Sequence, residues 1–224
     1  MLTIHCKCDS VAIEWPHKKV LWQLECCCNE CTTRIQYLHA EKNGPQPPAH
    51  QLLDGIWLKN DFTILKGLEN IGAFKLSPTG RTTCFYCSKC ATALLADHII
   101  YKELVVITQV HNFMDFDGLR NATLLGPQAR HFMRDLTSNQ RDRLPPFKGS
   151  HGALYEGVSD SLVEVFPELY KKGGTGIMNA QRLAEITGVS YLEIWETHTS
   201  TYCQPLIGLQ LQNLSKCTSL PIYR

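Results

Sequence analysis

The chain has 224 residues, enough for one large domain, or one domain with a substantial extension, to bury a hydrophobic core without disulfides. Its 22 Lys and Arg residues nearly balance its 21 Asp and Glu residues, so the charge argues against a nucleic acid or an anionic membrane as partner. The N-terminal sequence MLTIHCKCDS lacks the features of a secretory signal, and no apolar run approaches the roughly 20 residues of a membrane span. We therefore expect a cytoplasmic protein whose eleven cysteines serve metal binding rather than disulfide formation.

Short apolar runs separated by turn residues predict a mainly β fold for the first part of the chain. Runs rich in Val, Ile, Phe and Trp lie within residues 10–27, 61–77 and 102–110, with Pro, Gly, Asn and Asp between them. Between the first two runs, the three prolines of EKNGPQPPAHQ predict a loop over residues 41–51.

The pattern changes in the second part of the chain. The segment RLPPFKGSHG marks the expected boundary between a domain of residues 1–150 and an extension of residues 151–224. In the extension, segments that open at Ser or Thr and close at Gly predict helices over residues 159–172 and 175–188, and residues 197–213 predict a final strand. Such an extension would build a larger pocket or a subunit contact, as in a homodimer.

The cysteines are concentrated near the N-terminus, where nine of the eleven lie between Cys6 and Cys90. Cys6 and Cys8 form C-x-C, and on an extended strand residues i and i+2 share a face. Cys87 and Cys90 form C-x-x-C, the spacing of a turn that presents two thiolates to one ion. The two pairs together supply four ligands, which would close the coordination shell of a metal.

The stretch ECCCNEC supplies a second set of ligands, which we expect in a short turn. Cys26, Cys28 and Cys31 can converge on one ion and leave a coordination position free for water or substrate, as in catalytic zinc sites. Two alternatives stay open, because Cys27 could replace a neighbour and Cys84 begins a competing C-x-x-C with Cys87. Zinc is the metal expected for tetrahedral thiolate sites, with iron as the alternative. The isolated Cys203 and Cys217 fit ordinary buried residues.

In this order, the motifs C-x-C, C-x-C-x-x-C and C-x-x-C resemble those of the glutathione-dependent formaldehyde-activating enzyme family, which is grouped with the centromere protein V domain. The resemblance covers about residues 1–150, through IHCKC, LECCCNEC, FYCSKCATAL and VVITQV and more weakly through LLGPQARHFM and RLPPFKG. It implies a mainly β fold of the β-tent type that holds two zinc ions. One is structural, on Cys6, Cys8, Cys87 and Cys90, and the other, on Cys26, Cys28 and Cys31, joins glutathione to formaldehyde in the family.

The residues around the ligands differ from the family pattern. His5 and Asp9 stand where glycines usually flank the first C-x-C, and Ala91 replaces the glycine after the last cysteine. Cys27 and Thr32 also replace the usual residues at their positions. These differences favour a metabolite larger than formaldehyde, with glutathione retained as an optional co-substrate.

The expected function is therefore that of a zinc enzyme of the carbon–sulfur lyase or thiol–aldehyde adduct type, acting on a small molecule. Glu30 and His131 are the candidate acid and base groups, with His39 and His98 as weaker alternatives, and Arg34 would bind a carboxylate of the substrate or co-substrate. The alternative function is a non-catalytic zinc-binding interaction module, in which a further side chain completes the second metal site.

Overall fold

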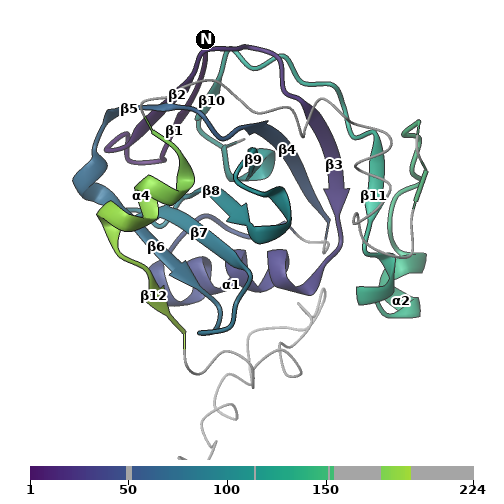
Figure 1. Ribbon diagram of the computed structural model, residues 1–224. Helices are drawn as coiled ribbons and strands as arrows, with labels where there is room; N and C mark the ends of the chain where they lie inside the picture. The colour runs from purple at the N-terminus through teal and green to yellow at the C-terminus, as the bar shows by residue number, and fades with distance from the viewer. Residues whose placement is uncertain (49–51, 114, 151, 154–177, 193–224) are drawn as a thin grey trace, which may run out of the picture.

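The structure is a computed structural model that describes residues 1–48, 52–113, 115–150, 152–153 and 178–192. Two β-sheets dominate it, one of four strands in the order β10-β1-β2-β5 and one of eight strands in the order β11-β3-β4-β9-β8-β7-β6-β12 (Figure 1). The mainly β fold expected from the sequence is thus confirmed. In the described part of the chain, no helix is long and apolar enough to cross a membrane.

The four-stranded sheet is built from β1 (Leu2–His5), β2 (Ala12–Trp15), β5 (Thr63–Lys66) and β10 (Leu119–Arg120). The eight-stranded sheet is built from β3 (Trp22–Cys26), β4 (Leu53–Lys59), β6 (Ile71–Lys75), β7 (Thr82–Cys87), β8 (Ala93–His98), β9 (Val105–Gln109), β11 (Ala129–His131) and β12 (Ser190–Tyr191). The helices are α1 (Asn29–Lys42), α2 (Ser138–Asp142) and α4 (Ala180–Thr187), with short 3-10 turns η1 (Leu68–Asn70), η2 (Ile99–Tyr101), η3 (Val110–Phe113) and η4 (Met133–Asp135).

Most described elements follow the sequence pattern. The three strand-rich runs contain β2, β3, β5, β6 and β9, as predicted. The predicted helix over 175–188 is α4, which ends before Gly188 as expected but starts only at Ala180, because the Asn179 side chain caps it by accepting the Arg182 N–H at 2.8 Å. The predicted helix over 159–172 and the final strand over 197–213 lie outside the described residues.

The alternation of side chains along the strands gives the eight-stranded sheet two buried faces. One face packs against the four-stranded sheet, through residues such as Ile56, Phe85 and Val106 against Ile4 and Ile13. The other face packs against α1, through a cluster that includes Trp22, Leu24, Trp57, Phe74, Ile107, Ile35 and Leu38. Helix α1 therefore covers the face toward which Cys26 and Cys84 also point.

The described part of the extension packs on the domain rather than standing apart from it. Leu183 of α4 is fully buried in the core between the sheets. Asn60 holds the start of α4, because its Oδ1 accepts the Ala180 N–H at 2.7 Å and its Nδ2 donates to Gln181 at 2.8 Å. Gln181 in turn donates to Asp97 of β8 at 2.7 Å.

A polar pair, the buried Gln23 and the half-buried Asp54, joins β3 to β4 and to the segment that leads to β11. The Gln23 Nε2 donates to both carboxylate oxygens of Asp54 at 2.9 Å, and the Gln23 Oε1 accepts the N–H groups of Leu125 and Gly126 at 3.0 Å. Burial raises the pKa of Asp54 to about 6, although the Gln23 hydrogen bonds oppose this shift. The fold therefore favours the protonated carboxyl group.

The raised pKa of Asp54 predicts a specific pH dependence of stability. Because the folded pKa lies above the unfolded value of about 4, the stability that Asp54 contributes is complete below that value and is lost as the pH rises through about 6. The free energy of unfolding of the metal-loaded wild type should thus fall, relative to that of Asp54→Asn, between pH 5 and pH 7. Urea unfolding across this range measures the difference, with the exposed Asp142→Asn as control. Parallel profiles for wild type and Asp54→Asn would contradict the assignment.

Candidate metal centres

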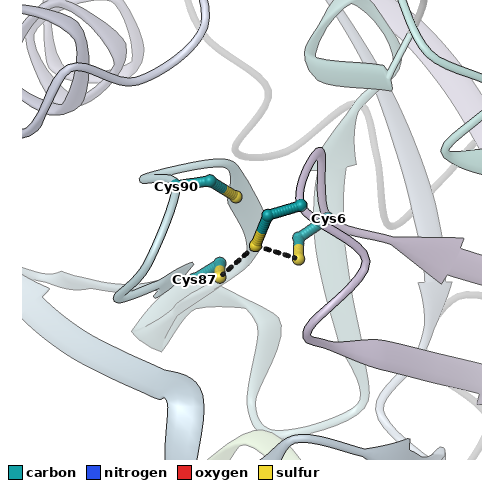
Figure 2. A group of neighbouring side chains, drawn as sticks. Cys6, Cys87 and Cys90 are labelled. Carbon is teal, nitrogen blue, oxygen red and sulfur yellow. Dashed lines mark hydrogen bonds between the residues drawn. The ribbon is translucent and has the colours of Figure 1, made fainter.

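The first group of cysteines lies where the two sheets meet. Cys6 and Cys8 follow β1 of the small sheet, and Cys87 and Cys90 lie at and beyond the end of β7 of the large sheet (Figure 2). The four sulfur atoms lie within 4.8 Å of one another, with 3.5 Å between Cys6 and Cys8 and 3.8 Å between Cys8 and Cys87. A tetrahedral zinc ion with bonds of about 2.3 Å to sulfur needs sulfurs about 3.8 Å apart. The four-cysteine group therefore fits such an ion, which would join the two sheets.

Hydrogen bonds pre-form this group. The Val11 N–H donates to the Cys6 sulfur at 3.3 Å, and the fully buried Thr92 hydroxyl accepts the Lys7 N–H at 3.1 Å. The same hydroxyl lies 3.2 Å from the Cys90 sulfur, so Thr92 links Cys90 to the Lys7 backbone between Cys6 and Cys8. The hydrogen bond with the Cys87 thiol, with help from Thr92, lowers the pKa of Cys90 to about 4.

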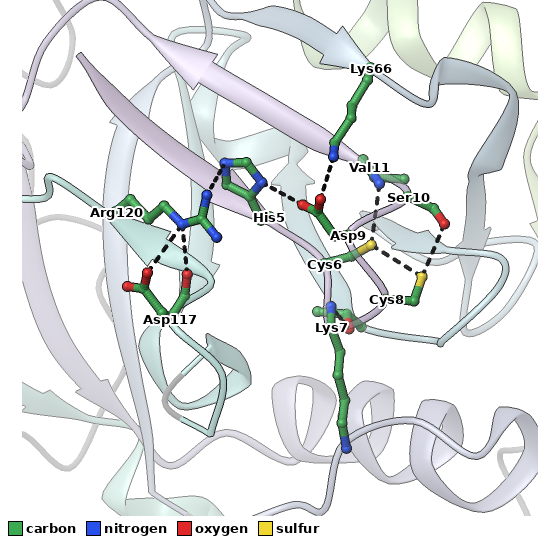
Figure 3. Close-up of polar contacts among 11 residues, drawn as sticks. His5, Cys6, Lys7, Cys8, Asp9, Ser10, Val11, Lys66, Asp117 and Arg120 are labelled. Carbon is green, nitrogen blue, oxygen red and sulfur yellow. Dashed lines mark hydrogen bonds and ion pairs between the residues drawn. The ribbon is translucent and has the colours of Figure 1, made fainter.

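Two of the three residues expected to stand in glycine positions beside this group, Asp9 and Ala91, adopt a backbone conformation that favours glycine. Asp9 has φ 54° and Ala91 has φ 51°, in the left-handed region. Asp9 is held there because its carboxylate accepts hydrogen bonds from His5 Nδ1 at 2.8 Å and Lys66 Nζ at 2.6 Å (Figure 3). His5 and Asp9, both departures from the family pattern, thus stabilise each other across the turn. The hydrogen bond from Lys66, with that from His5, lowers the pKa of Asp9 to about 2.

The second group lies at the junction of β3 and α1. Cys26 ends β3, Cys28 is the N-cap of α1 and Cys31 lies in its first turn. The three sulfurs lie within 4.8 Å of one another, with 3.8 Å between Cys26 and Cys31, which is the spacing that a tetrahedral ion requires. The Cys28 sulfur also accepts the Cys31 N–H at 3.3 Å, so it caps the helix while facing the other two sulfurs. The short turn expected here is therefore wrong, because Glu30 and Cys31 already belong to a helix.

The structure settles both alternatives that the sequence left open. Cys27 is fully buried on the other side of the chain, with its sulfur 3.9 Å from the Met133 sulfur, and burial raises its pKa to about 11. Cys84 lies apart from the four-cysteine group and accepts a hydrogen bond from Arg34 at 3.3 Å. The expected ligand sets are therefore the ones that the fold brings together. Within the described part of the chain, no fourth Cys, His, Asp or Glu joins Cys26, Cys28 and Cys31.

Arg34 lies against this three-cysteine group, and it is buried, with only 5% of its surface exposed. Its Nη2 donates to the Cys31 sulfur at 2.9 Å, while Nη1 donates to Cys84. The thiols of Cys26 and Cys28, together with this guanidinium, hold the pKa of Cys31 well below its usual range. By contrast, hydrogen bonding with neighbouring thiols and burial raise the pKa of Cys26 well above it.

The two residues expected to act as acid and base lie in different surroundings. Glu30 is half-buried in the first turn of α1, one residue before Cys31. His131 is buried on β11, where it pairs with Cys26 in the sheet and its ring lies 5.5 Å from that of Trp22. His39 lies near the other end of α1, where its Nδ1 is 3.0 Å from the Gly44 carbonyl.

Tyr101 packs against the cluster that contains Cys26 and Cys31, and His98 lies beside its ring. Their rings lie 5.7 Å apart, and Tyr101 also packs its edge against Trp57 at 6.2 Å. Burial raises the pKa of Tyr101 well above its usual range, with the charges of Cys31 and Cys26 adding to the effect. The His98 Nδ1 accepts the Ile100 N–H at 3.0 Å, so the neutral ring carries its proton on Nε2. The position of Tyr101 in a 3-10 turn about 70 residues after Cys31 left no sequence signal.

A small cavity beneath α1 reaches Arg34 and Cys84 but not the sulfurs of Cys26, Cys28 or Cys31. Thr108, Gln109 and Asn112 add further polar groups to the lining, and the remaining lining residues are apolar. Neither a family model nor a curated protein matches the chain.

We predict that each cysteine group binds one metal ion and that the loss of each ion has a different effect on the fold. Cys87→Ser should lose one ion and unfold the chain, because a structural thiolate zinc contributes on the order of 10 kcal/mol to folding. Cys28→Ser should also lose one ion but keep the fold, since the cores on both sides of the large sheet remain. Elemental analysis with circular dichroism measures both effects, and Cys27→Ser is the matched control that should retain two ions. A Cys27→Ser protein with one ion would contradict the ligand assignment.

Proposed function

We propose that the protein is a zinc enzyme of the glutathione-dependent formaldehyde-activating type, which forms or cleaves a carbon–sulfur bond at the three-cysteine group. The observation that carries the proposal is the convergence of Cys26, Cys28 and Cys31 without a fourth ligand among the described residues. The four-cysteine group would hold the second zinc as a structural ion. The matching order of the cysteine motifs supports the family assignment.

Zinc with an open coordination position lowers the pKa of a bound thiol or water and polarises a carbonyl group. The residues around the group complement this chemistry. His98 presents a protonated Nε2 and Tyr101 retains its hydroxyl proton, so both can donate a hydrogen bond to an oxygen that gains negative charge. Glu30, half-buried beside Cys31, would accept the proton released by an incoming thiol.

The substrate that we propose is a small thiol adduct or aldehyde larger than formaldehyde. The half-buried ring of Tyr101, which packs against the buried Trp57, lies in the same apolar cluster as Cys26 and Cys31 and would offer an apolar contact to an organic substrate. Arg34, proposed from the sequence to bind a carboxylate, already donates to two sulfurs. A glutathione co-substrate would then need another cationic residue to bind its carboxylates. Glutathione is therefore only one of the thiols in the test below.

A second function, a non-catalytic zinc module, is favoured by one observation. Cys26 and Cys31 are only 5% and 9% exposed, and the cavity under α1 stops short of all three ligand sulfurs. In this function a further side chain would complete the coordination of the ion, and no position would be open to a substrate.

The test is turnover by the purified zinc-loaded protein. Formaldehyde and larger aldehydes are mixed with a panel of thiols that includes glutathione, and formation or cleavage of the adducts is followed by NMR. We expect metal-dependent turnover that Cys28→Ser abolishes and Cys27→Ser retains. His98→Gln should lower the rate about 100-fold or more, since a positioned acid or base contributes that much. Activity that survives Cys28→Ser would exclude the three-cysteine group as the site.

A further inference from the structure

Among the described residues, Arg34 is the only cationic side chain that donates a hydrogen bond to a sulfur of either cysteine group. Arg34 follows Cys31 by three positions on α1, a spacing that places two side chains on one face of a helix. Its guanidinium donates to Cys31 at 2.9 Å and is held on the other side by Cys84 of β7 at 3.3 Å. The helix and the sheet thus fix the guanidinium from both sides.

A buried charge requires a compensating charge. In the described residues Arg34 forms no ion pair with a carboxylate, although Arg130, equally buried, forms one with Glu25 at 2.6 Å. The partners of Arg34 are two sulfur atoms instead. Both hydrogen-bond partners of the guanidinium are therefore sulfur atoms, and the shorter distance makes Cys31 the nearer one.

The four-cysteine group offers a comparison within the same molecule. Its sulfurs accept hydrogen bonds from the Val11 N–H and meet the hydroxyls of Ser10 and Thr92. In the described part of the chain, none of these sulfurs receives a hydrogen bond from a cationic side chain. Charge compensation by a side chain is thus specific to the three-cysteine group, where an outside ligand would bind.

We infer that Arg34, positioned by Cys84, neutralises the three-cysteine centre and thereby adapts it to an anionic fourth ligand, a thiolate or hydroxide. The inference rests on the proposed function, because it needs an open position. Three thiolates around a dication leave a net charge of −1, which would repel an anion, and the guanidinium brings the sum to zero. Arg34 is therefore a positioning residue that acts through Cys31 rather than a group that binds the substrate.

The test uses cobalt in place of zinc in the full chain, since cobalt absorption reports changes of coordination. The probes are azide, a small anion, and imidazole, a neutral ligand of similar size. Arg34→Gln should weaken azide binding about tenfold, because loss of a second-shell partner typically has an effect of this size, and should leave imidazole binding nearly unchanged. Arg34→Lys, which keeps the charge, should restore azide binding, and the exposed Arg143→Gln is the control.

Cobalt affinity separates this role from a merely structural one. Arg34→Gln removes a cation that repels the metal ion, so the affinity for cobalt should stay unchanged or rise. If Arg34 only supported the fold, the same substitution would lower the affinity for cobalt. Cys84→Ala, which keeps the arginine but removes its second contact, should weaken azide binding by a smaller factor. The inference, but not the proposed function, would be overturned by either of two results. One is equal azide binding by wild type, Arg34→Gln and Cys84→Ala, and the other is loss of cobalt from Arg34→Gln. A wild type that takes neither probe would overturn the proposed function itself.

Discussion

Close approach of sulfur atoms is the constraint on which the rest of the structure depends. The fold brings four sulfurs together between its two sheets and three together at the junction of β3 and α1. Thiolates at such distances repel one another strongly unless a cation lies between them. The two groups are thus stable arrangements for a metal-loaded chain, and their different numbers of sulfurs imply different roles.

Helix α1 links the two groups physically. Its first turn carries Cys28 and Cys31, and its last turn leads through Asn43, with φ 55°, into Gly44. A Cβ atom on Gly44 would lie 2.8 Å from the carbonyl oxygen of Ala91, next to Cys90 of the four-cysteine group. Because only glycine allows this close approach, one end of the helix is fitted to the four-cysteine group, while the other end carries two sulfurs of the three-cysteine group. The fold therefore positions the three-cysteine group on a rigid element.

The sequence was informative where spacing alone determines geometry. The C-x-C spacing of Cys6 and Cys8 and the C-x-x-C spacing of Cys87 and Cys90 predicted which sulfurs come together. The strand expected to carry Cys6 and Cys8 is wrong, because β1 ends at His5 and both cysteines follow it, with Cys8 in a turn. The mainly β architecture followed from short apolar runs between turn residues. Helix α1 was missed because its first residues, NECTT, are polar or cysteine side chains and do not form an apolar stripe.

Contacts between distant segments could not be read from the sequence. Arg34 was expected to bind a carboxylate of the substrate or co-substrate, but the packing of α1 on β7 buries it against Cys84. Tyr101 joins the cluster that contains Cys26 and Cys31 only because η2 returns to the same face of the sheet, and His98 packs against its ring. His5 and Asp9 were recognised as departures from a glycine pattern, whereas their mutual hydrogen bond required the folded turn.

The most direct measurement is cadmium NMR of the full chain loaded with cadmium-113, because the chemical shift of this nucleus distinguishes four sulfur ligands from three. The account predicts two resonances of equal intensity, one typical of four thiolates and one shifted toward sites with a nitrogen or oxygen ligand. The second resonance alone should move when an exchangeable ligand such as imidazole is added. Two resonances that both correspond to four thiolates, or a single bound ion, would contradict an open site at Cys26, Cys28 and Cys31.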